Sequence, residues 1–262
     1  MIYSKNGELT NFHDLLKASK NHDVILFGEL HNNPISHWLQ YELTNDLFLN
    51  TKGKIQLGAE MIESDNQLLL NEYLKGIITE KNFTSQARLW PNYETDYSPL
   101  INFAKANKLK FIATNVPRRY ASIVNKKGFS TLDSLSTQAK EYIAPLPIPY
   151  DPNLSSYKKM QNMMGGKHNF PNLPKAQALK DATMAWNIGK NIISGNAFIH
   201  VNGSYHSDNF QGICWYLNKY YPKLKALTIT TVEQDNINKL DDKNLGVADF
   251  IIVVPNTMTK TY

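Results

Sequence analysis

The stretch VILFGELHNN, residues 24–33, decides how the rest of the chain is interpreted. Four apolar residues, 24–27, run into a glycine, and Glu29 and His31 follow within three positions. A continuous apolar run that ends at glycine is typical of a strand buried on both faces of a sheet. An acid and an imidazole at the end of such a strand suit acid/base or metal chemistry better than a core.

Similar apolar, β-branched runs recur along the chain, at residues 55–60, 110–114, 197–201, 226–232 and 250–255. Helical patterns lie between several of them, at residues 33–50, 65–76, 98–108 and 174–195. Strands separated by helices are typical of βαβ units. We therefore predict an α/β fold with a mainly parallel β-sheet flanked by helices. In the helix over 33–50, the spacing places Trp38 on the same apolar face as Leu43 and Leu47.

The stretch over about 120–173 has a different composition. It carries four prolines within the eight residues 145–152, followed by the Met- and Gly-rich segment MMGGKHNF at 163–170. Because no strand pattern fits, we predict a smaller helical lobe here within a single α/β unit spanning residues 1–262. In one alternative, residues 64–95 join this lobe.

Composition excludes several function classes. The 28 Lys and Arg residues outnumber the 23 Asp and Glu residues, but they are scattered, which argues against a nucleic-acid partner. The single cysteine, Cys214, allows no intrachain disulfide and no cysteine-based zinc site. No apolar stretch reaches the roughly 18 residues of a membrane span, and the N-terminus shows no leader pattern.

Polar residues follow several of the predicted strands. The carboxyl ends of neighbouring parallel strands form the ligand crevice of an open α/β sheet. We therefore expect one rim to collect Glu29, His31, Glu60, Arg118 and His206. Two carboxylates and two imidazoles suit a divalent metal or acid/base chemistry, and Arg118 suits an anionic group. Taken singly, each is equally explained as a solvated loop residue or a helix cap, and His200 is expected to be a core histidine.

Five motifs carry a resemblance to a known family: GELH, GAEM, WPNYETDYSPLINFAKANKLKFIATNVPRR, AQALKDATMA and NGSYHSDNFQGI. Between Val24 and Leu217 the chain resembles the ChaN family of iron-regulated haem-binding lipoproteins of Gram-negative bacteria. That family belongs to a superfamily with erythromycin esterases and the Tiki/TraB proteins. The resemblance implies that Gly28 to His31, Glu60 and Gly203 to His206 match elements that serve hydrolysis elsewhere in the superfamily.

The resemblance also implies haem bound through a tyrosine, with two haems stacked face to face in a homodimer and a histidine assisting. The helical lobe offers Tyr150 or Tyr157 as the ligand of haem iron, and His168 as the histidine. Met160 and Met164 would contact the porphyrin, and Lys167 would meet a propionate. A phenolate is a hard donor that favours ferric iron.

Two functions follow as hypotheses. The first is a haem-binding protein of bacterial iron acquisition, anchored by a lipid at the periplasmic face of the outer membrane and served by an outer-membrane haem receptor system. The second is a hydrolase that uses the rim of Glu and His residues, with or without a divalent metal.

Overall fold

An eight-stranded sheet forms the centre of the computed structural model, which describes residues 1–163 and 171–262. The strands are β1 (Ile2–Ser4), β2 (Leu9–Thr10), β3 (Val24–Glu29), β4 (Ile55–Glu63), β5 (Phe111–Asn115), β6 (Ala197–Gly203), β7 (Ala226–Gln234) and β8 (Phe250–Pro255). Their order across the sheet is β2-β1-β8-β7-β3-β6-β4-β5. Every pairing among β3 to β8 is parallel, and β1 runs antiparallel to both β2 and β8.

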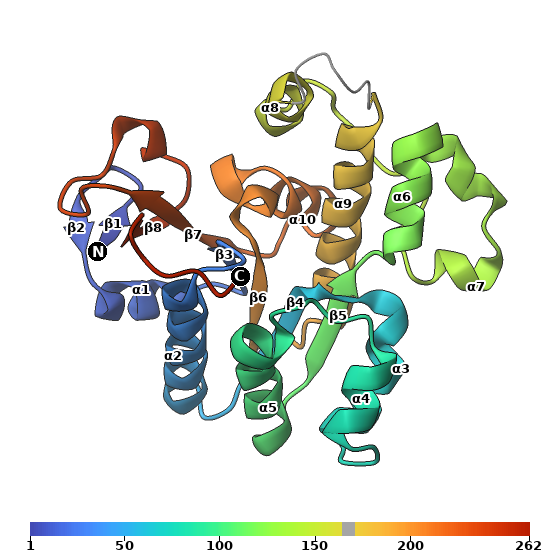
Figure 1. Cartoon of the computed structure of the whole chain (residues 1–262), viewed down its shortest axis with the longest axis horizontal. Helices are drawn as coiled ribbons and strands as arrows, with labels where there is room; N and C mark the ends of the chain where they lie inside the picture. The colour runs from blue at the N-terminus through green and yellow to red at the C-terminus, as the bar shows by residue number, and fades with distance from the viewer. Residues whose placement is uncertain (164–170) are drawn as a thin grey trace.

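Helices cover both faces of this sheet (Figure 1). They are α1 (Phe12–Ser19), α2 (Pro34–Asn50), α3 (Gln67–Leu74), α4 (Glu80–Gln86), α5 (Ser98–Ala106), α6 (Arg118–Lys127), α7 (Thr137–Lys140), α8 (Ser155–Met163), α9 (Leu173–Asn191) and α10 (Ile213–Tyr220). A π-helical turn, η2 (Tyr93–Tyr97), leads into α5. None of the helices in the described part of the chain is long and apolar enough to cross a membrane.

Alternation along β3 shows how the two faces are filled. Ile25 and Phe27 belong to a hydrophobic cluster with residues of α1 to α5, whereas Val24 and Leu26 belong to a second cluster with α6, α9 and α10. Successive side chains of a strand point to opposite faces, so a strand covered on both sides is apolar throughout. This explains why the apolar runs do not alternate with polar residues.

The predicted α/β fold and its six parallel strands are confirmed. Strands β1 and β2 were not predicted because they have only three and two residues. Strand β4 extends to Glu63 through a register shift after Ala59, so Glu60 lies within the strand rather than beyond its end. A bulge of this kind re-aims side chains locally.

Helix α2 differs from its prediction on one point. Trp38 is 59% exposed, so its predicted place on the buried face is wrong. The helix instead buries polar side chains, among them Ser36, Gln40 and Thr44. The hydroxyls of Ser36 and Thr44 and the amide N–H group of Gln40 form hydrogen bonds, and these residues are buried beside Leu43 and Leu47 on the face that packs on the sheet.

The segments proposed for the helical lobe fall in different parts of the molecule. Residues 120–163 form most of α6, then α7 and α8, and these pack with α9 in the second cluster. Residues 64–95 include α3 and α4, which pack in the first cluster. The two segments therefore cover opposite faces of the sheet, and in Figure 1 α8 lies far from α4.

Candidate functional site

The strand order brings three polar strand ends together. Strands β3, β6 and β4 are neighbours, so Glu29, Gly203 and Glu60 come from adjacent strands. The chain leaves β6 through a short turn, η4 (Ser204–His206), which places His206 beside Glu60. The fold thus collects these groups at one rim, as parallel sheets do.

His206 lies between two buried carboxylates. Its Nε2 is 3.0 Å from Glu60 Oε1, and its Nδ1 contacts Asp181 of α9 on the other side. The backbone N–H of Gly203 donates to Glu60 Oε2 at 2.8 Å. All three side chains are buried, with exposures of 5%, 4% and 1% for His206, Glu60 and Asp181. The imidazole is therefore held by both of its nitrogens.

This arrangement favours an imidazolium at position 206. Burial alone would lower the pKa of His206, but the charges of Glu60 and Asp181 outweigh burial and raise it to about 10. Burial would raise the pKa of Glu60, and the neighbouring His206 outweighs it and holds the pKa well below its usual value. The pKa of Asp181 is raised because burial outweighs its pairing with His206.

His31 reaches the same rim from β3. Its Nδ1 is 2.9 Å from Glu29 Oε1, and its ring packs edge-on against Trp90 with centroids 4.7 Å apart. A Cβ on Gly203 would lie 2.7 Å from His31 Nε2, so only glycine leaves room for this imidazole. Burial lowers the pKa of His31, and the hydrogen bond that its ring donates to Glu29 and the charge of Glu60 raise the pKa more, so the net shift is upward.

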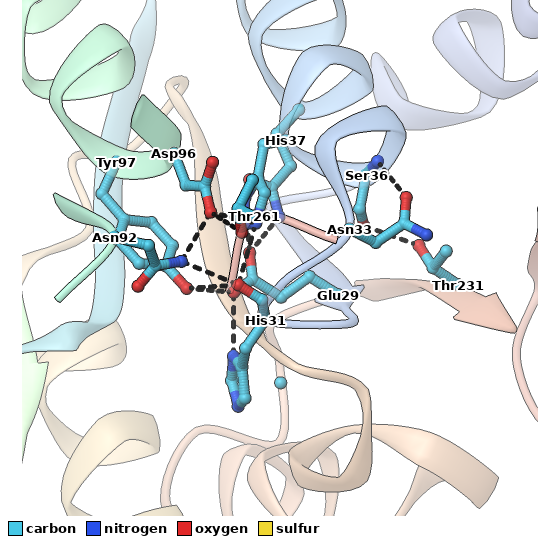
Figure 2. A network of polar contacts seen from close by, with 12 residues as sticks. Glu29, His31, Asn33, Ser36, His37, Asn92, Asp96, Tyr97, Thr231 and Thr261 are labelled. Atoms are coloured by element: carbon cyan, nitrogen blue, oxygen red, sulfur yellow. Dashed lines mark hydrogen bonds and ion pairs between the residues drawn. The ribbon is translucent and has the colours of Figure 1, made fainter. Parts of the chain in front are cut away.

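Behind His31, the buried Glu29 is the centre of a second network (Figure 2). Its carboxylate accepts from the Tyr97 hydroxyl at 2.8 Å and from the Gln40 amide at 2.6 Å. His37 Nδ1 lies 3.4 Å from Glu29 Oε2, and His37 Nε2 lies 3.4 Å from Asp96 Oδ2. Figure 2 shows the His31 imidazole pointing away from this network, with Nε2 at its free end.

Of the predicted rim residues, Glu29, His31, Glu60 and His206 lie together, and Arg118 does not join them. Arg118 begins α6, is exposed, and forms no hydrogen bond or ion pair with any described residue. The fully buried His200 is a satisfied core residue, as expected, contacting Thr114 Oγ1 at 2.7 Å and Asn202 Oδ1 at 3.1 Å. Burial lowers the pKa of His200 to about 4, so it is neutral.

The divalent metal considered for the rim finds no support. Within residues 1–163 and 171–262, no three His, Cys, Asp or Glu residues are arranged to hold a metal ion. The rim carboxylates are instead paired with imidazoles and with N–H or O–H donors. Ion pairs of this kind serve acid/base or electrostatic roles without a metal.

The tyrosines proposed as haem ligands stack on each other. The rings of Tyr150 and Tyr157 have centroids 5.4 Å apart at an interplanar angle of 26°. Tyr157 on α8 is 1% exposed, whereas Tyr150 is half-buried in the loop before α8. Met160 is half-buried, one turn after Tyr157. The remaining predicted residues, Met164, Lys167 and His168, lie outside the described residues.

Several residues of the site were not predicted as site residues. Asp181 and Gln177 lie on α9, and His37 and Asp96 lie on α2 and η2. Their signal was the family motifs AQALKDATMA and WPNYETDY, in which three of them occur. Taken as single residues they carried no signal, because a polar side chain gives no sign of which helix face is buried.

The fold and the buried carboxylate–imidazole rim define a doubly wound α/β protein with a polar site at its strand ends. A family described as "Haem-binding uptake, Tiki superfamily, ChaN" matches residues 15–217. The chain belongs to this family, which confirms the predicted resemblance. A comparison with curated proteins gave no match.

Two solved structures with TM-scores above 0.5 show the same fold. ChaN of Campylobacter jejuni, described with cofacial heme binding, superposes with a TM-score of 0.70 at 19% identity, covering 95% of this chain and 94% of that chain. The type III effector HopBA1 gives a TM-score of 0.53 at 13% identity, covering 92% and 91%. An erythromycin esterase in its open conformation gives 0.49 at 11% identity, covering 89% and 77%.

Proposed function

We propose that this protein binds haem through Tyr150. The observation that carries the proposal is the family match, which spans residues 15–217 and thus includes the helical lobe as well as the rim. The similarity of fold to a ChaN protein with cofacial heme agrees with it. The choice of Tyr150 rests on the surroundings of the two candidate tyrosines.

Tyr150 fits the role of an iron ligand better than Tyr157. The Tyr150 hydroxyl forms no hydrogen bond with a described residue, and its ring is fixed by Phe129 and by Tyr157. The Tyr157 hydroxyl is fully buried, so iron could reach it only after the lobe repacks. Burial raises the pKa of both phenols, and ferric haem would supply the positive charge that favours the phenolate.

The surroundings of Tyr150 also suit a porphyrin. Helix α8 presents the exposed Lys158 and Lys159, which would meet propionates, and the half-buried Met160, which would contact the ring. A single protein face leaves the other porphyrin face in water. Pairing two loaded protomers face to face would remove that apolar surface at roughly 25 cal/mol per Å². We infer a homodimer that forms on haem binding.

The biological setting belongs to the same proposal. A haem-binding member of this family would serve bacterial iron acquisition, held by a lipid anchor at the periplasmic face of the outer membrane and supplied by an outer-membrane haem receptor. A ligand that stabilises ferric iron suits such a carrier better than an oxygen binder.

Titration with haemin tests the proposal directly. We expect a Soret band that saturates at one haem per protomer, together with a shift from monomer to dimer in sedimentation velocity. The matched control is the same titration with zinc protoporphyrin in place of haemin, again followed by sedimentation. Its metal binds a phenolate less strongly than ferric iron does. Binding that does not saturate would contradict specific haem binding. Saturation without a change in the sedimenting mass of the protein would contradict the dimer.

A second candidate function, acid/base hydrolysis at the rim, is favoured by the position of His31. Its Nδ1 is fixed by Glu29, its Nε2 is at the free end of a side chain that is 35% exposed, and it stands beside the Glu60–His206 pair. Such an imidazole can take a proton from water, and the Glu29 carboxylate at its Nδ1 stabilises the imidazolium that forms.

Ester hydrolysis by the purified protein tests this second candidate. We expect turnover of activated esters that falls by about 100-fold or more in His31→Gln, because a general base contributes roughly 10²- to 10⁴-fold. Arg118→Gln, exposed and away from the rim, is the matched control and should keep full activity. Activity that persists in His31→Gln would exclude the imidazole as the base.

A further inference from the structure

A cavity of about 290 Å³ opens beside the Glu29 network, on the side away from the rim. It lies between the first turns of α2 and the junction of η2 with α5. Its walls include Pro34, His37, Trp38, Tyr41, Asp96 and Pro99. Neither function proposed above uses this cavity.

The carboxylate in the cavity wall belongs to Asp96, whose side chain is 3% exposed. Its Oδ2 is fully engaged: it accepts from Asn92 at 2.6 Å and from Thr261 at 2.8 Å, and it lies 3.4 Å from His37 Nε2. Its Oδ1 receives no hydrogen bond from the described residues, and Figure 2 shows this oxygen turned away from the network. This oxygen is therefore free to accept a hydrogen bond from water or from a ligand in the cavity.

Trp38 and Tyr41 add two aromatic rings to the lining of the cavity. Trp38 is held in place by a hydrogen bond from its indole N–H to Glu42, at 3.1 Å, and is 59% exposed. Tyr41 packs edge-on against Phe103 with centroids 5.6 Å apart. Ammonium groups favour a fixed indole and phenol beside a carboxylate, because the faces of the rings carry partial negative charge and the carboxylate is an anion.

The same features argue against an anionic ligand. The first turn of α2 would attract an anion, but Asn33 Oδ1 already accepts from the N–H groups of Ile35 and Ser36. Glu42 adds a second carboxylate near Trp38. No lysine or arginine is among the residues that line the cavity.

We propose that this cavity is a binding site for a small organic ammonium ion, held by Asp96 Oδ1 and the ring of Trp38. The ammonium N–H groups donate to the free carboxylate oxygen, the charged end lies against the ring of Trp38, and the alkyl part contacts Tyr41 and Pro99. The site is connected to the rim, because His37 contacts Asp96 on one side and Glu29 on the other, at 3.4 Å each. It is independent of haem binding at Tyr150.

Titration with n-butylammonium chloride tests the proposal, with 1-butanol as the neutral probe of the same shape and potassium chloride as the salt control. We expect saturable, roughly millimolar binding of the amine alone, as suits so small a ligand. Of the four tryptophan indole N–H signals in a ¹⁵N-correlated spectrum, the one absent from Trp38→Ala should shift. Trp38→Ala should weaken binding about two- to fivefold, the effect of one partly exposed cation–π contact.

Asp96→Asn should weaken binding by roughly tenfold or more, because it removes the charge that faces the cavity. Leu68→Ala, at an exposed position on α3, is the matched control and should leave binding unchanged. Should Asp96→Asn not fold, the exposed Trp38→Ala and the indole shift still decide the question. Equal binding of 1-butanol, or an indole signal of Trp38 that does not move, would overturn the proposal.

Discussion

Replacing Tyr150 by Phe should abolish the tyrosine–iron charge-transfer bands of the haem complex and weaken haemin binding by roughly tenfold or more, equivalent to about 1.4 kcal/mol or above. The substitution removes one oxygen and keeps the ring that stacks on Tyr157 and packs edge-on against Phe129, so the lobe retains its packing. Without a phenolate, ferric haem keeps only its apolar and propionate contacts. Absorption and resonance Raman spectra of the haemin complex, with affinity from a Soret titration, provide the measurement.

Tyr157→Phe is the matched control for this prediction. It removes a buried hydroxyl that has no hydrogen-bond partner among residues 1–163 and 171–262, so protein stability should stay the same or rise slightly. The haem spectrum should be that of the unmodified protein. The reverse result, with the tyrosine bands lost in Tyr157→Phe and kept in Tyr150→Phe, would mean that α8 repacks to expose Tyr157 to iron.

The parallel core of the fold could be predicted because its strands are buried on both faces. Strands β3 and β8 are apolar over five or six residues, a pattern that surface segments do not maintain. The short antiparallel strands β1 and β2 escaped prediction, since two or three residues carry no periodicity. Trp38 was misplaced because helix α2 buries polar side chains such as Gln40 beside the correctly predicted Leu43 and Leu47, and a hydrophobic pattern cannot detect these polar contacts.

The residues of the site were predictable only where they follow a strand. Glu29, His31 and Glu60 were found because each stands at or near the end of an apolar run. Asp181 faces His206 from α9, 25 residues away, and only packing of that helix against the sheet brings the two together. The cavity at Asp96 depends on a carboxylate orientation fixed by Asn92 and Thr261, which no local pattern encodes.

Replacing His206 by Gln should lower the free energy of unfolding by about 3–5 kcal/mol, the usual cost of removing one partner from a buried ion pair. His206 contacts Glu60 and Asp181, and both carboxylates are buried, so its loss leaves two negative charges close together in a poorly solvated place. Urea unfolding at neutral pH measures the effect. His13→Gln, at an exposed position on α1, is the matched control and should change stability by no more than about 0.5 kcal/mol.

The pH dependence of stability gives a sharper form of the same prediction. The pKa of His206 is about 10 in the folded protein, against a usual value of 6.5, so between these limits the native state holds a proton that the unfolded chain has lost. The stabilisation is complete below about pH 6.5 and is lost as pH rises toward 10, with a slope of up to about 1.4 kcal/mol per pH unit. Glu60 acts at the other end, because its lowered pKa gives stability that is present above the usual value and lost as pH falls through the folded one.

Urea unfolding at intervals from pH 6 to 10 should therefore show stability falling in the unmodified protein, and the difference from His206→Gln shrinking steadily. A difference that stays constant across this range would show that His206 is already neutral at pH 7 and that its two carboxylates do not hold it as a cation.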